Sequence, residues 1–254
     1  MEPIALVPML DVQRRIYDLP PGRGRFERYL AVMTDPVGEL ALPLPAFNPM
    51  GKAHVAATLD ALLALGAEDV AAKALAGASP RLVRAGGNFR VGLVVADDLG
   101  GGWTNRFTTE VDQRFRSGPM LKRGWAVALF WTSEPPTAES VAREALAAAF
   151  RAAYAHRHGP ATTLRRMMAQ EGPAAAFAGA SKPPLDAEEL AYTAEVLRPH
   201  LDSDDFPALF ACLHGDAAAR ALGYDPLGLV PRAGYALALA EALARPDPPE
   251  ATLD

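Results

Sequence analysis

The sequence predicts a helix-rich α/β fold: a small, mostly parallel sheet around strands at 89–97 and 125–132, flanked by helices, with a helical C-terminal part. Two observations carry this prediction. Residues 89–96 and 125–131 are short, nearly continuous apolar runs, which are typical of strands covered on both faces. The segment between the runs has a helical period, so together they form a βαβ unit, whose strands should be parallel and whose connection should be right-handed.

The segment 103–116 decides this topology. Two series of residues recur at every fourth position. The first is apolar and consists of Trp103, Phe107, Val111 and Phe115. The second alternates in charge and consists of Arg106, Glu110 and Arg114. On a helix the first series makes one apolar stripe, and each pair of opposite charges adds roughly 0.2–0.5 kcal/mol. A strand is the alternative, because Phe107, Val111 and Phe115 also share odd parity. That strand would place Thr109 and Gln113 on the apolar face and leave the charge spacing unexplained, so we favour the helix.

The remaining elements follow from periodicity and from turn residues. Residues 4–7 are expected to form a short strand, and 38–43 a weak strand that Pro43 confines to an edge. Asn48-Pro49 is a favourable helix start, with Asn48 as the cap. We expect helices over about 10–19, 25–33, 48–65, 67–75, 137–158, 162–178 with an interruption at Gly172-Pro173, 186–198, 203–214 and 231–244.

The domain organisation predicted from these elements has three parts. Residues 1–160 form the α/β core, and residues 161–245 form a helical segment packed on that core, or the two together form a single domain. The proline-rich, acidic residues 246–254 are expected to be a flexible tail.

Composition excludes several classes of partner. The net charge of −5 argues against binding of nucleic acid or of an anionic membrane surface. The arginines between 14 and 28 alternate with acidic residues, as expected of a solvated helix face. The single cysteine, Cys212, fits a reducing compartment, and neither a signal peptide nor an apolar stretch of membrane-spanning length is recognisable, so a cytoplasmic location is expected. The sequence leaves the oligomeric state open.

The leading candidate site is the turn at 97–105, after the first central strand. Ligands of open α/β sheets bind beyond the carboxyl ends of the strands, where a turn that opens a helix offers free N–H groups. Glycines allow the backbone to approach a ligand closely. The expected ligand-binding residues are Asp97, Gly100, Gly101, Gly102, Asn105 and Arg106. The pattern is neither a P-loop nor a dinucleotide fingerprint, since no Lys-Ser or Lys-Thr follows and Asn105 replaces the third glycine.

Charge narrows the kind of ligand. Two carboxylates near a phosphate oppose it by roughly 1–4 kcal/mol per charge pair, more than the roughly 0.3–1 kcal/mol that a helix N-terminus contributes. Asp97 and Asp98 therefore suit a ligand with hydroxyl or amine donors, or Mg²⁺ as a cofactor. The alternative is that both carboxylates only cap the turn. The candidate catalytic residues are Asp98, as an acceptor, and His54, as a base; a partly buried structural histidine is the alternative for the latter.

The sequence contains no motif for metal binding or for a serine nucleophile. No His-x-x-x-His, Cys-x-x-Cys or Gly-x-Ser-x-Gly pattern occurs, so no metal site or α/β-hydrolase serine is predicted. Two functions remain. The first is a small-molecule-binding protein or an enzyme of unknown reaction with its pocket at 97–105, and the second is a non-catalytic protein–protein interaction domain.

Overall fold

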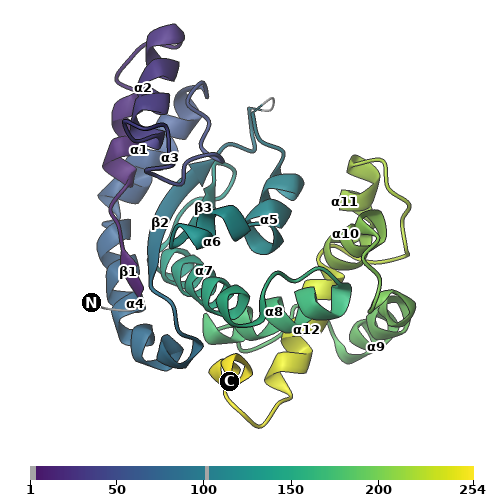
Figure 1. Ribbon diagram of the computed structural model, residues 1–254. Coiled ribbons are helices and arrows are strands. Elements are labelled where there is room, and N and C mark those ends of the chain that lie inside the picture. Colours follow the sequence, from purple (N-terminus) through teal and green to yellow (C-terminus); the bar gives the residue numbers. More distant parts are fainter. Residues whose placement is uncertain (1–3, 101–102) are drawn as a thin grey trace. The chain divides into compact units, whose positions relative to one another are not determined.

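The computed structural model describes residues 4–100 and 103–254 (Figure 1). The chain divides into two compact units, Met1–Ala152 and Ala153–Asp254, and the division falls within the long helix α7. The strands, the α-helices and the 3-10 helices (η) follow in chain order: β1 Ile4–Leu6, α1 Leu10–Ile16, α2 Arg23–Met33, α3 Ala53–Ala64, α4 Ala67–Leu82, η1 Val83–Ala85, β2 Phe89–Ala96, α5 Arg106–Phe115, α6 Gly118–Lys122, β3 Trp125–Trp131, α7 Ala138–His158, α8 Leu164–Phe177, α9 Ala187–Leu197, η2 Arg198–His200, α10 Phe206–His214, α11 Asp216–Ala221, α12 Ala233–Leu243 and η3 Pro249–Leu253.

The predicted fold class is confirmed: the protein is a helix-rich α/β protein with a parallel sheet flanked by helices and a helical C-terminal half. Within the described residues the sheet has three strands in the order β1-β2-β3, and both pairs are parallel. Strand β2 pairs with β3 along its length, from Arg90 opposite Trp125 to Ala96 opposite Trp131. All its side chains except that of Arg90 are buried, as expected for a central strand with covered faces.

The segment that links β2 to β3 is helical, as favoured from its charge spacing. Helix α5 covers Arg106–Phe115, and Val111 and Phe115 from the predicted apolar stripe are buried. The ion pair between Glu110 and Arg114, 2.6 Å apart, links residues one turn apart on the helix. Because a helix separates them, β2 and β3 can pair in parallel.

A glutamine completes the sheet where β1 ends. Strand β1 pairs with β2 only as far as Leu6, opposite Val91. Beyond that point the buried Gln13 of α1 donates from its amide to the carbonyl of Leu93 (2.7 Å) and accepts from the N–H of Val95 (3.0 Å). The side chain thus satisfies one donor and one acceptor of β2 that a longer β1 would otherwise bond.

Close packing of α1 on β2 also depends on a glycine. A Cβ at Gly92 would lie 2.0 Å from Cε of Met9, which is fully buried just before α1. The glycine therefore makes room for the methionine side chain. Helices α1 and α3, which pack against each other and against β2, bring residues from the N-terminal third of the chain to the end of β2 (Figure 1).

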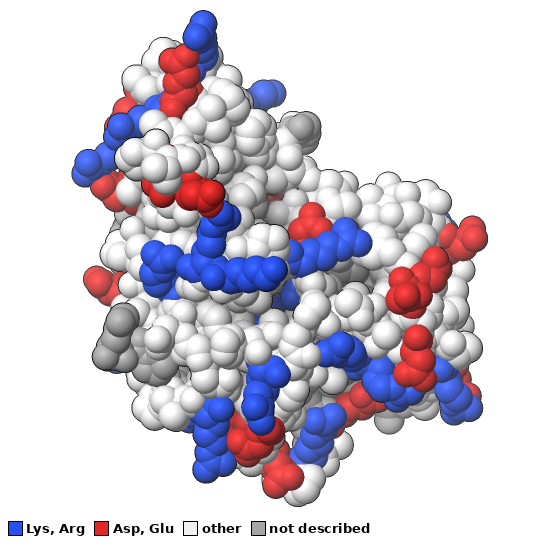
Figure 2. All heavy atoms as spheres, viewed as in Figure 1, with Lys and Arg blue, Asp and Glu red and all other residues white. Residues whose placement is uncertain are grey.

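Within the arginine-rich stretch between 14 and 28, Arg14, Arg15 and Arg23 pair with acids on the helix surface. Arg15 pairs with Asp11 at 2.7 Å and Arg23 with Glu27 at 2.6 Å, each one turn away on the same helix. Figure 2 shows basic and acidic side chains beside one another around α1 and α2. At these positions the arrangement agrees with the predicted solvated face. Arg25 differs, because it is 6% exposed and donates to the carbonyl of Leu19.

The second unit is an assembly of helices. Helix α12 packs against α8, α9 and α10, and η3 packs against α8. Gly172 of α8 allows the closest approach, because a Cβ there would lie 2.1 Å from the carbonyl oxygen of Ala238 in α12. The tail predicted to be flexible contains η3, and its Leu253 is buried.

Several predicted elements differ from the structure. The segment 38–43 forms no strand; a single isolated bridge joins Thr34 and Leu40. Helix α4 continues through Pro80, and α8 continues through Gly172-Pro173. A proline inside a helix removes one N–H···O=C bond, and here packing of the helix compensates for that loss.

The helix expected to begin at Asn48 begins at Ala53 instead. Asn48 forms a turn, in which its side-chain oxygen accepts from the N–H of Met50 at 2.9 Å. Its amide group is engaged elsewhere, in the site described below. No helix among the described residues combines the length and the apolar character needed to cross a bilayer.

Candidate functional site

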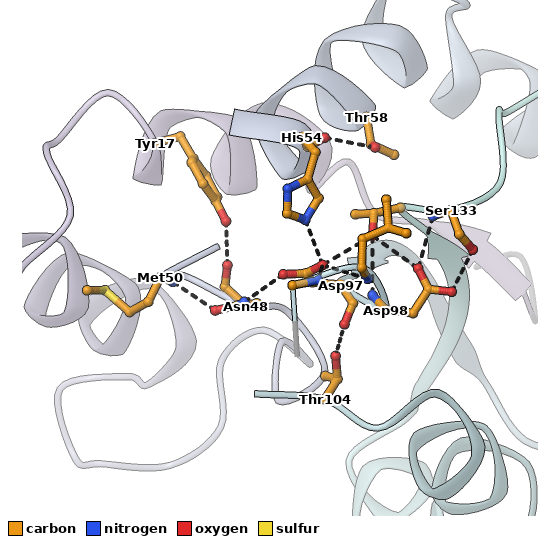
Figure 3. Close-up of polar contacts among 12 residues, drawn as sticks. Tyr17, Asn48, Met50, His54, Thr58, Asp97, Asp98, Thr104 and Ser133 are labelled. Atoms are coloured by element: carbon orange, nitrogen blue, oxygen red, sulfur yellow. Dashed lines mark hydrogen bonds and ion pairs between the residues drawn. The ribbon is translucent and has the colours of Figure 1, made fainter. Parts of the chain in front are cut away.

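The site centres on the carboxylate of Asp97, the first residue after β2. Its side chain is 1% exposed and lies between Asn48 and His54 (Figure 3). Oδ1 accepts from Nε2 of His54 at 2.7 Å, and Oδ2 accepts from Nδ2 of Asn48 at 2.9 Å. Oδ1 also accepts from the backbone N–H groups of Leu99 (3.1 Å) and Gly100 (2.9 Å). The end of β2, the start of α3 and the turn before α3 thus meet on one carboxyl group.

This environment keeps Asp97 ionised. Burial by itself raises the pKa of a carboxyl group, because the charged form loses hydration. Hydrogen bonds from His54, Gly100 and Asn48 to the carboxylate outweigh that effect, so the pKa of Asp97 lies below its ordinary value. At neutral pH the group is therefore an acceptor in each of these bonds.

The ionised carboxylate fixes the tautomer of His54. Because Asp97 can only accept, Nε2 of His54 must carry the proton of their hydrogen bond. In the neutral imidazole the other nitrogen, Nδ1, then has a free lone pair. Among the described residues Nδ1 has no hydrogen-bonding partner, and the side chain is 28% exposed. A histidine held by a buried carboxylate on one side and open on the other can accept a proton from a ligand.

Tyr17 forms a hydrogen bond to the backbone of Asn48. Its hydroxyl donates to the carbonyl of Asn48 at 2.5 Å, and the guanidinium of Arg25 lies over its ring, 4.7 Å from the centroid. Burial raises the pKa of Tyr17, and the charge of Asp97 raises it further, whereas Arg25 lowers it. The net shift is upward, so the hydroxyl stays protonated and remains a donor.

Two glycines allow these groups to approach. A Cβ at Gly51 would lie 2.7 Å from the hydroxyl of Tyr17, and one at Gly100 would lie 2.6 Å from Oδ2 of Asp97. At both positions a side chain would displace a group of the site. Gly100 thus leaves room for the carboxylate of Asp97, and its predicted contact with a ligand stays a prediction.

Asp98 lies on the other side of the turn and is bound by a different set of groups. It points away from His54 and toward Ser133 (Figure 3). Its Oδ2 accepts from Oγ of Ser133 (2.6 Å) and from Nη1 of Arg106 (2.9 Å), while Oδ1 accepts from the N–H of Ser133 (2.9 Å). Burial raises the pKa of Asp98, but the bonds from Ser133, Thr132 and Arg106 hold it below its ordinary value.

The other predicted ligand-binding residues are divided between local structure and this second cluster. Arg106 links Asp98 to Glu134 and lies over the ring of Trp131, 5.1 Å from the centroid. Asn105 is the N-cap of α5, where its side chain accepts from two N–H groups of the first turn. Gly101 and Gly102 lie outside the described residues.

Thr132 connects the two carboxylates. Its hydroxyl lies 3.2 Å from Oδ1 of Asp97 and 3.1 Å from Oδ1 of Asp98. Thr132 follows β3 as Asp97 follows β2, so the parallel register places both at the same edge of the sheet. The hydroxyl of Thr104 donates to the backbone carbonyl of Asp97 and holds the turn closed.

Sequence reasoning selected His54, Asp97 and Gly100 but missed Asn48, Tyr17 and Thr132. For Asn48 the sequence predicts a helix cap, because Asn-Pro is a common helix start. The signal that could have identified Thr132 is its position directly after the second buried strand. Nothing in the local sequence connects Tyr17 with the site.

An aromatic cluster borders the site. Trp103 of the turn packs against Tyr29 (6.0 Å between centroids) and Phe26 (6.3 Å), both of α2. Tyr29 in turn contacts Phe47, the neighbour of Asn48. Trp103 is 40% exposed, so the cluster presents an indole surface close to the turn.

Among the described residues no group of three or more His, Cys, Asp or Glu side chains is arranged to hold a metal ion. Each described carboxylate of the site is instead bound by N–H and O–H donors of the protein. The chain matches no protein-family model, and no curated protein or solved structure matches it significantly.

Proposed function

We propose that this protein is a cytoplasmic enzyme that binds a small molecule at the turn 97–105 and removes a proton from it, or from a water molecule, with His54 as the general base. The observation that carries the proposal is the 2.7 Å hydrogen bond between the buried carboxylate of Asp97 and the partly exposed imidazole of His54. The buried, free thiol of Cys212 supports a reducing compartment.

In this proposal His54 and Asp97 have different functions. Nδ1 of His54 accepts the proton, and Asp97 is the positioning residue that holds the ring and stabilises the imidazolium that forms. A well-placed general base of this kind contributes about 10²–10⁴-fold to a rate. Asn48 and the N–H groups of Leu99 and Gly100 keep Asp97 in place. Asp98 and Arg106 stabilise the far side of the turn, and they are the next residues to test for ligand contacts.

The first measurement is the tautomer of His54. Nitrogen-15 NMR of the imidazole should show Nε2 protonated and Nδ1 unprotonated in the neutral ring. In Asp97→Asn that preference should weaken, because an amide can also donate. A neutral ring with the proton on Nδ1 in the native protein would contradict the proposed direction of the hydrogen bond.

The second measurement concerns ligands and turnover. A thermal-shift screen with nucleotides, sugars and amino acids should find a compound that raises the melting temperature, since binding to the folded form stabilises it. Turnover of that compound should fall about 10²–10⁴-fold in His54→Gln and stay unchanged in the control His200→Gln. Equal turnover by His54→Gln and the native protein would refute a general-base function.

A non-catalytic protein–protein interaction domain is the second candidate, and the exposed apolar side chains of unit 1 favour it. Phe26, Leu30 and Trp103 are 37%, 37% and 40% exposed, and Phe26 contacts Trp103. If they form an interface between two copies, sedimentation should show association that Phe26→Ser and Trp103→Ser reduce. A monomer at all concentrations would remove this candidate.

A further inference from the structure

The second unit contains a cavity of about 360 Å³ that the proposed function does not use. It lies among the last turns of α7, helix α8, the end of α12 and the segment that leads into η3. Alanine and proline residues form most of its wall. The polar side chains that line it are Tyr154, His158, Arg245, Asp247 and Thr252. A volume of this size is at the lower end of the range for small-molecule sites, roughly 300–1,000 Å³.

Tyr154 is the first observation that points to a ligand. The residue is only 7% exposed, and its hydroxyl has no hydrogen-bonding partner among the described residues. Among the described residues the fully enclosed side-chain atoms without a partner are Oγ of Ser79 and Nε1 of Trp125, so the hydroxyl of Tyr154 is open to the cavity that its side chain lines. It can therefore donate to a molecule bound in the cavity.

The neighbouring histidine holds the ring of Tyr154 in place. The ring of His158 packs on it with 4.5 Å between centroids. Nε2 of His158 donates to the carbonyl of Thr252 at 2.8 Å, which ties α7 to η3. This packing fixes the orientation of the Tyr154 ring and therefore the position of its hydroxyl.

The charge around the hydroxyl is positive. Burial raises the pKa of Tyr154, while the charges of Arg166 and Arg245 lower it, with a net upward shift. The hydroxyl is thus a donor at neutral pH, and two cations lie near it. Arg245 forms no ion pair within 4.0 Å among the described residues.

Two acidic residues oppose an anion in this region, and neither neutralises Arg245 directly. Asp247 lines the cavity and is exposed, and Glu241 interacts with Arg245 only through longer-range attraction. The anionic end of a ligand is therefore best placed at Tyr154 and Arg245, with its apolar part against the alanine and proline wall.

We propose that this cavity binds a small molecule with an apolar body and an anionic oxygen group, either a carboxylate or a phosphate. The hydroxyl of Tyr154 donates to that group and the guanidinium of Arg245 pairs with it. Hydrogen bonds to charged groups are shorter and stronger than neutral ones, and guanidinium fits both oxyanions. The proposal is independent of the site at Asp97, because all the residues involved belong to unit 2.

The test uses the full chain and three matched probes at constant ionic strength: benzoate, phenyl phosphate and the neutral benzamide. Calorimetry and amide NMR should detect binding of at least one anionic probe, with shifts at Tyr154, His158 and Thr252. Benzamide should bind at least fivefold more weakly. Tighter binding of benzoate than of phenyl phosphate identifies a carboxylate site, and the reverse order identifies a phosphate site.

Two variants and a control assign the binding to these side chains. Tyr154→Phe and Arg245→Gln should each weaken the anionic probe about tenfold, whereas Arg198→Gln, an exposed arginine of η2 paired with Glu195, should not. His54→Gln should also bind normally. The proposal is overturned if no anionic probe binds at millimolar concentration, if benzamide binds equally well, or if both variants bind like the native protein.

Discussion

At the scale of single residues, the site depends on one carboxylate that is buried and still charged. Asp97 keeps its charge because four N–H donors, from two side chains and two backbone groups, point to its oxygens. The charge then determines which nitrogen of His54 is protonated. The chemistry proposed for His54 therefore depends on the groups that bind Asp97 as well as on His54 itself.

Gly100→Ala tests this packing. The new Cβ would lie 2.6 Å from Oδ2 of Asp97. Since Asp97 is held in place, we expect the free energy of unfolding to fall by about 1–3 kcal/mol, and the NMR signals of His54 to shift.

Gly77→Ala is the matched control for that substitution. Gly77 lies within α4, and a Cβ there would meet nothing within 4 Å. Alanine should stabilise the helix by roughly 0.5–1 kcal/mol. Urea denaturation measures both variants, and an equal effect of the two substitutions would contradict the close approach at Gly100.

At the scale of elements, the helix after the turn begins at a side-chain cap. Asn105 accepts from the N–H groups of Phe107 and Thr108 at 3.0 and 3.2 Å. Asn105→Ala should lower the free energy of unfolding by about 0.5–2 kcal/mol, and Asn105→Ser should lower it much less, because serine is also a good cap. Loss of ligand binding in Asn105→Ser with unchanged stability would instead indicate direct contact with the ligand.

The packing of α8 against α12 requires a glycine at position 172. Gly172 faces the carbonyl of Ala238, which a Cβ would approach to 2.1 Å. Backbone cannot move aside as a flexible side chain can, so Gly172→Ala should lower the free energy of unfolding of unit 2 by about 1–3 kcal/mol or more. Circular dichroism during thermal unfolding measures this loss; an unchanged melting temperature would show that the two helices are not in this contact.

At the scale of the whole molecule, the two strand-end carboxylates link stability to pH. The pKa values of Asp97 and Asp98 are both lowered in the folded protein. Their contribution to stability is therefore fully present above the ordinary carboxyl pKa, about 3.9, and is lost as the pH falls through the lower folded values.

The pH dependence is measured by comparing the native protein with Asp98→Asn. Chemical denaturation at pH 7 should show the variant to be less stable, because the amide cannot accept all the bonds that Ser133 and Arg106 donate to the carboxylate. The difference should shrink below about pH 4, because Asp98 in the unfolded chain then becomes protonated while the native carboxylate, with its lower pKa, is still ionised. A difference that stays constant down to pH 3 would contradict the lowered pKa.

The sequence by itself determined the local parts of this protein. Strands β2 and β3 follow from apolar runs that only a covered sheet can bury, and α5 follows from a charge spacing that only a helix brings together. The same reasoning located the turn after β2 and selected Asp97 and His54. These features depend on residues that are close in the sequence, and the spacing of those residues can be read directly from it.

Only the tertiary structure decided which groups meet at that turn. Asn48 and Asp97 are 49 positions apart in the chain, and His54 and Asp97 are 43 apart. No local pattern encodes such contacts, because they arise from the packing of α1 and α3 on β2. Tertiary packing also explains why α4 and α8 continue through prolines that local propensity predicts as helix ends, since burial of a helix face outweighs one lost hydrogen bond.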